Sequence, residues 1–115
     1  IAALRALKRR NPYARMEKLA KSLTREIARA ASQHGTALVV NQIGGLFTMF
    51  FSDQAVVDYQ SAKRTDTKKY AKFFQNLLKK EVYFPPSNFE ACFVSASHGS
   101  QDIEKTVTAI TQSLA

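Results

Sequence analysis

Several features that would define a function class are scarce or missing in this sequence. Cys92 is the only cysteine among 115 residues, which excludes an internal disulfide and is compatible with a reducing cytoplasm. No apolar run approaches the roughly 18–20 residues of a transmembrane helix, so we expect no membrane as a partner. The four glycines form neither a GxGxxG nor a GxxG pattern. The sequence therefore predicts neither a dinucleotide-binding loop nor a KH-type nucleic-acid clamp.

Side chains that commonly carry catalysis are also sparse. Neither His34 nor His98 belongs to a spaced set of metal ligands, so no metal site is predicted. Cys92 lies among Phe and Val, a setting typical of a buried and inert thiol. Every lysine lies in a charged helical or loop segment, away from the ends of the apolar strands. A Schiff-base lysine needs partial desolvation to lower its pKa, so none is predicted in this chain.

Positive charge is abundant but unevenly distributed. The net charge is +8, and residues 1–33 hold nine Lys/Arg against two Glu, a net +7. Residues 54–81 hold seven against three acids, a net +4, and the remaining residues sum to −3. A solvated basic face on two helices explains this pattern. A module that binds nucleic acid or an acidic partner is the alternative, although no aromatic platform accompanies the basic residues.

The spacing of apolar residues predicts the element order α, β, β, α, β, α. This order is typical of an α+β domain, a small antiparallel sheet packed against helices on one face. Pro12 suits a helix start, Gly35 a helix end, Thr65 or Asp66 a cap, and Ser100 another cap. The expected elements are helices over 1–11 and 12–35, strands over 36–43 and 46–52, a helical turn over 53–59, a helix from 66, a main strand over 89–97 and a helix from 100.

Glu90 stands out because it interrupts an apolar stretch, NFEACFVSAS. In an extended strand it would share a face with Cys92 and Val94. Burying an unpaired carboxylate is costly, so Glu90 either reaches solvent or backbone N–H groups at the strand entrance or belongs to a site. The residues alone leave both interpretations open.

Three motifs, in this order, resemble the C-terminal part of the glutamate-1-semialdehyde 2,1-aminomutase family, within the class III pyridoxal-phosphate aminotransferases. They are GGLFTMFFSD over 44–53, DTKKYAKFF over 66–74 and PPSNFEACFVSASH over 85–98. The resemblance covers essentially the whole chain. It implies the small C-terminal domain of a fold-type I enzyme, with residues 1–33 as helices leading from a large domain and 34–115 as the small domain. The initial Ile1 fits a piece of a longer polypeptide.

The resemblance also implies a function. The family converts glutamate 1-semialdehyde to 5-aminolevulinate in tetrapyrrole biosynthesis, an isomerisation by intramolecular amino transfer. The implied cofactor is pyridoxal phosphate, with its Schiff-base lysine in the large domain. The implied partners are that large domain, a second subunit in a cytoplasmic homodimer and a small-molecule substrate, and the 115 residues alone are expected to be inactive.

Site residues follow from the same resemblance. Many class III aminotransferases carry an arginine in the equivalent late strand, which holds a substrate carboxylate. Residues 83–99 contain no arginine and have Glu90 instead, which favours the aminomutase over another class III aminotransferase, the alternative. Glu90 is thus predicted to orient the amino groups of the reacting molecule, with Ser87 near the rim of the cleft. Cys92 stands where the family often has glycine, which we interpret as a packing variation.

Overall fold

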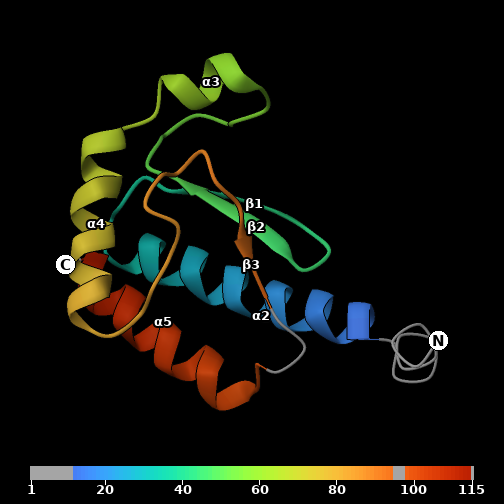
Figure 1. Cartoon of the computed structure of the whole chain (residues 1–115). Coiled ribbons are helices and arrows are strands. Elements are labelled where there is room, and N and C mark those ends of the chain that lie inside the picture. The colour runs from blue at the N-terminus through green and yellow to red at the C-terminus, as the bar shows by residue number, and fades with distance from the viewer. Residues whose placement is uncertain (1–11, 95–97, 115) are drawn as a thin grey trace.

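The computed structural model describes residues 12–94 and 98–114, and Figure 1 shows their course. The three strands form one antiparallel sheet in the order β1-β2-β3. This architecture confirms the predicted α+β class, whereas the helix expected over 1–11 lies outside the described residues. The elements are α2 (Pro12–Gln33), β1 (Val39–Ile43), β2 (Leu46–Phe50), α3 (Tyr59–Lys63), α4 (Thr67–Lys79), β3 (Cys92–Phe93) and α5 (Ser100–Leu114).

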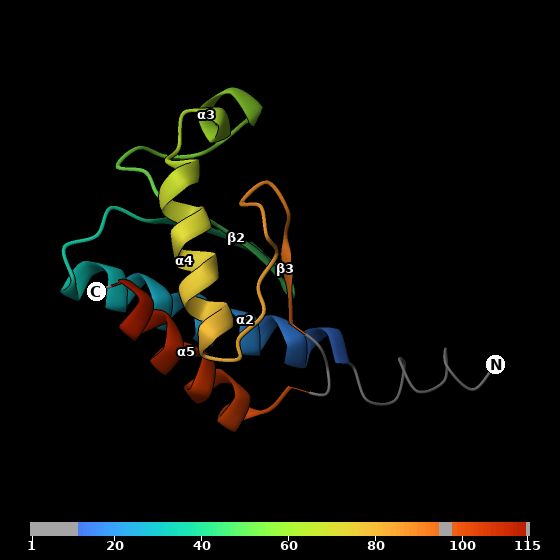
Figure 2. The ribbon, with the colours of Figure 1, turned by 60° about the vertical axis from the view of Figure 1, so that its left-hand side comes forward.

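One hydrophobic core lies between the sheet and the helices. Helices α2 and α5 run alongside each other under the sheet, and α4 crosses at one end (Figures 1 and 2). Helical spacing predicted most of the residues that fill this core, but Leu78, the last member of the stripe expected on α4, is 45% exposed. The core residues of the three helices and β2 include Ala20, Leu23, Ile27, Phe47, Met49, Tyr70, Phe73, Leu77, Ile103 and Ile110.

The β1–β2 hairpin is tight because Gly44 takes a left-handed φ of 55° in its two-residue turn. Strand β1 begins at Val39 rather than at residue 36 as predicted. The intervening backbone closes helix α2 instead: the Thr36 N–H donates to the Ala31 carbonyl at 2.9 Å, and Gly35 has a φ of 65°.

Two predicted helix starts need correction. The turn expected over 53–59 is extended or bent, and α3 begins only at Tyr59 because Asp58 caps it. The Ser61 N–H donates to Asp58 Oδ1 at 2.7 Å, and the Asp58 N–H donates to Ser61 Oγ at 3.1 Å. Ser100 is the first helical residue of α5 and not its cap. By contrast, Asp66 caps α4 as predicted, accepting the Lys69 N–H at 2.9 Å.

Candidate functional site

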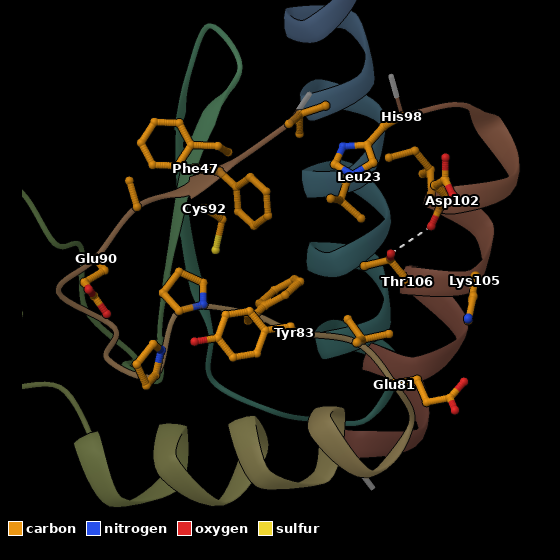
Figure 3. A pocket seen from close by; sticks show the side chains of 18 residues that line it. Leu23, Phe47, Glu81, Tyr83, Glu90, Cys92, His98, Asp102, Lys105 and Thr106 are labelled. Carbon is orange, nitrogen blue, oxygen red and sulfur yellow. Dashed lines mark hydrogen bonds between the residues drawn. The ribbon is translucent and has the colours of Figure 1, made fainter. Parts of the chain in front are cut away.

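A cavity of about 790 Å³ separates the chain segment 81–94 from the first turns of α5 (Figure 3). Leu23 of α2 and Phe47 of β2 contribute apolar lining. Glu90 lies at one end of the cavity, while Glu81 and Lys105 lie towards the other. Cys92 lies between these ends in Figure 3, and Asp102 lies on the same side as Lys105, on α5.

Glu90 belongs to a turn and not to the strand that the sequence predicted. Residues 86–90 turn back on themselves, with the Glu90 N–H donating to the Ser87 carbonyl at 3.1 Å, and β3 comprises only Cys92–Phe93. Residues 95–97 of the predicted strand lie outside the described part of the chain. The Glu90 side chain is exposed, lines the cavity and forms no ion pair within the described residues.

Ser87 lies in the same turn but does not line the cavity. It is half-buried, and its hydroxyl accepts the Phe89 N–H at 3.2 Å. This hydrogen bond is typical of a serine that stabilises a turn. The structure therefore brings Ser87 and Glu90 into one turn but places only Glu90 beside the cavity.

Three residues that the sequence analysis did not single out as site residues hold this turn. The Tyr70 hydroxyl donates to the Pro85 carbonyl at 2.8 Å, and the Asn88 amide donates to Thr65 Oγ1 at 3.1 Å. Asn88 is only 3% exposed. The sequence shows that Asn88 lies two residues before Glu90. It does not show that Asn88 is buried, because the spacing of apolar residues does not predict the burial of a polar side chain.

Cys92 is a buried free cysteine, as predicted. Burial raises the pKa of its thiol to about 12. Burial also raises the pKa of Tyr70, with a smaller contribution from the negative charges that Cys92 and Glu90 would carry nearby. Cys92 is therefore a protonated packing residue at neutral pH.

We expect the Cys92 thiol to react with a thiol reagent far more slowly in the folded chain than in denaturant. With a pKa of about 12, roughly one thiol in 10⁵ is ionised at pH 7, and the thiolate is the nucleophile. The measurement is the labelling rate with a chromogenic disulfide in native buffer and in denaturant. Comparable rates in the two conditions would show that the thiol is accessible and activated.

The cavity lining does not suit a phosphate group. Three carboxylates, Glu81, Glu90 and Asp102, line the cavity with one ammonium group, Lys105. This excess of negative charge repels an anion and attracts a cationic amino group. The described residues also contain no cluster of three or more potential metal ligands. The described lining therefore lacks the cluster of positive charge that would hold the phosphate of pyridoxal phosphate.

Comparison with known proteins shows which sequences the chain resembles. No family model matches it. A glutamate-1-semialdehyde 2,1-aminomutase of Syntrophomonas wolfei is 43% identical over 113 residues, which is 98% of this chain and 26% of that protein. The chain is a homologue of part of the glutamate-1-semialdehyde 2,1-aminomutases. A second aminomutase, from Thermus thermophilus, is 41% identical over 99% of the chain, so the resemblance predicted from the three motifs is confirmed.

The chain spans about a quarter of the length of the aminomutases that it matches. Solved structures share its fold over a similar fraction. An omega-transaminase of Sphaerobacter thermophilus aligns over 97% of this chain and 25% of its own, with a TM-score of 0.79 and 18% identity. An aminomutase of Pseudomonas aeruginosa aligns over 89% of this chain and 22% of its own, with a TM-score of 0.78 and 18% identity. The fold is thus one that aminomutases share with transaminases.

Within the described residues, no helix combines the length and the apolar character needed to cross a bilayer.

Proposed function

We propose that this chain is the small C-terminal domain of a pyridoxal-phosphate-dependent aminomutase that converts glutamate 1-semialdehyde to 5-aminolevulinate for tetrapyrrole synthesis. The single observation that supports this most is the 43% identity to an aminomutase over 98% of the chain. Three curated relatives at 40–43% identity are aminomutases, which favours the aminomutase activity. The solved transaminase and the solved aminomutase are both 18% identical and show the fold alone.

We also propose the large domain, the connection to it and the oligomeric state of the complete enzyme. The large domain binds pyridoxal phosphate and supplies the Schiff-base lysine, since the acidic cavity of this chain does not fit the phosphate. Residues 1–33 lead from that domain into residues 34–115. The complete polypeptide works as a homodimer in the cytoplasm.

The proposed contribution of this domain centres on Glu90. Its exposed carboxylate lies at the end of an acidic cavity, where it attracts and orients a positively charged amino group of the substrate. Pyridoxal phosphate supplies the amino-transfer chemistry when bound, and Glu90 supplies orientation and charge balance. Ser87 lies near the rim in this proposal, and its role is to stabilise the turn that carries Glu90.

An exposed apolar strip on the open face of the sheet supports the proposed packing against a large domain. Ile43 pairs with Leu46 and Leu46 pairs with Phe93, so the three side chains lie on one face. Ile43 is 77% exposed and Phe93 is 73% exposed. Further along this face, Phe50 and Val39 pack with Val56. This chain matches only 26% of the aminomutase relative, so about three quarters of such a polypeptide lies outside the match. The occupant proposed for the strip is this remainder of the same polypeptide.

We expect Phe93→Asp to destabilise the complete polypeptide but not the isolated chain. In the isolated chain the new carboxylate stays in water, whereas docking of the large domain would bury it unpaired, at a cost of several kcal/mol. The melting temperatures of both forms provide the measurement. Val57→Asp is the matched control, because Val57 is 83% exposed and outside the strip. Equal shifts in the two forms would count against docking at this strip.

The isolated chain is expected neither to bind pyridoxal phosphate tightly nor to catalyse. Lys105 is the one lysine that lines the described cavity, and it is exposed, so its amine lacks the desolvation that activates a Schiff-base lysine. Adding the cofactor to the isolated chain should leave the spectrum of free pyridoxal phosphate unchanged. A spectral shift that persists through gel filtration would contradict this expectation.

The second candidate is the small domain of another class III aminotransferase, because the omega-transaminase shares the fold as well as the aminomutase does, with TM-scores of 0.79 and 0.78. Initial rates of the complete polypeptide separate the two functions. The aminomutase uses glutamate 1-semialdehyde alone, whereas an aminotransferase needs an amino donor and a keto acid acceptor. Rates that appear only with donor and acceptor pairs would favour the second candidate.

A further inference from the structure

The turn that presents Glu90 is fastened to the α3–α4 region. The Tyr70 hydroxyl of α4 holds the Pro85 carbonyl at 2.8 Å, just before the turn. The Asn88 amide in the turn donates to Thr65, which lies between α3 and α4, at 3.1 Å. The Phe89 ring lies 6.0 Å from the Tyr59 ring of α3. The position of Glu90 along the cavity therefore depends on a region that contributes no residue to the cavity lining.

The link between Thr65 and Asn88 is buried and directional. Thr65 is 6% exposed and Asn88 is 3% exposed. The Thr65 hydroxyl donates to the Ala62 carbonyl at 2.7 Å, which leaves its oxygen as the acceptor for the Asn88 amide. Because both groups are removed from water, the Asn88 amide depends on Thr65 for this hydrogen bond, whereas the Thr65 hydroxyl also has the Ala62 carbonyl as a partner.

The link reaches Glu90 through a short and stiff piece of backbone. Asn88 precedes Glu90 by two residues, and the hydrogen bond from the Glu90 N–H to the Ser87 carbonyl closes the turn around it. The Glu90 side chain forms no ion pair within the described residues that would fix it independently. The backbone turn thus sets the point from which the Glu90 side chain extends along the cavity.

We infer that Thr65 and Asn88 are positioning residues for Glu90, and that Tyr70 is a second anchor of the same turn. This inference rests on the proposed role of Glu90. Loss of the Thr65 acceptor frees Asn88 and lets the turn shift, so the carboxylate leaves the productive position without any change in its charge. A displacement of about 1 Å is enough to lower turnover strongly when orientation carries catalysis.

The test is a double-mutant cycle in the complete polypeptide loaded with pyridoxal phosphate. Thr65→Val removes the hydroxyl at nearly constant volume, and Thr65→Ser keeps it. We expect Thr65→Val to lower kcat about tenfold with little change in KM, and Thr65→Ser to stay within twofold of the parent. In the Glu90→Gln background, Thr65→Val should have no further effect, because the group that it positions is already gone.

The outcomes separate this inference from the function on which it rests. If Glu90→Gln leaves kcat unchanged, the proposed role of Glu90 is wrong and the positioning role falls with it. If Glu90→Gln lowers kcat but Thr65→Val lowers it by the same factor in both backgrounds, Glu90 acts as proposed and the positioning role is overturned. Tyr70→Phe, which removes only the hydroxyl that holds Pro85, provides a second cycle with the same expected pattern if Thr65→Val does not fold.

Discussion

Replacing Glu90 with glutamine in the complete polypeptide is expected to lower kcat about a hundredfold, the size seen when one preorganised electrostatic contact is removed. The substitution keeps the shape of the side chain and removes its negative charge. In the proposed function, that charge attracts a cationic amino group to this end of the cavity. Stability should not change, because the side chain is exposed and forms no ion pair within the described residues.

Steady-state kinetics, the spectrum of the bound cofactor and the melting temperature together test this prediction. Glu104→Gln on α5 is the matched control, an exposed carboxylate that does not line the cavity of Glu90, and it should stay within twofold of the parent. Equal losses in the two variants would show a general effect of net charge. Unchanged kcat and spectrum in Glu90→Gln would remove the proposed role of this residue.

Truncating Ile27 to alanine is expected to destabilise the isolated chain by about 2–5 kcal/mol, the usual cost of such a cavity in a core. Ile27 is 0% exposed and packs in the core that α2 shares with the sheet, α4 and α5. Ile27→Val is the matched control and should cost about 0.5–1.5 kcal/mol. Denaturant unfolding followed by circular dichroism gives both values.

This prediction also bears on how α2 relates to the rest of the chain. If α2 were only a connector to the proposed large domain, Ile27→Ala would cost less than about 0.5 kcal/mol, as surface substitutions do. The core contacts of Ala20, Leu23 and Ile27 argue for the larger value. The proposed boundary after residue 33 then does not separate two cores, because α2 packs in the same core as the residues that follow it.

Elements with a clear apolar period were predictable from the sequence. The stripe at Tyr70, Phe73 and Leu77 identified the buried face of α4, and the Gly44-Gly45 pair identified the hairpin. The signal for α3 was also present, because Asp58 and Ser61 have the spacing of a capping box. The prediction instead placed a helical turn over 53–59, before this capping box begins its helix.

The third strand shows why an apolar, strand-like composition alone was insufficient. Residues 89–97 have that composition, but Ser87 forms a local turn that continues to Glu90 and delays the pairing until Cys92. The signal was the serine and asparagine after two prolines. The link from Asn88 to Thr65 spans 23 positions and follows from the packing of the turn on the α3–α4 region, so no local pattern contains it.

The central claim is that this chain is part of an aminomutase, and the most direct test is an assay of the complete polypeptide. Purified enzyme with pyridoxal phosphate is given glutamate 1-semialdehyde and no other amino donor or acceptor, and 5-aminolevulinate is quantified over time. The proposed function predicts many turnovers under these conditions. No product, or product only when a separate donor and acceptor are added, would contradict it.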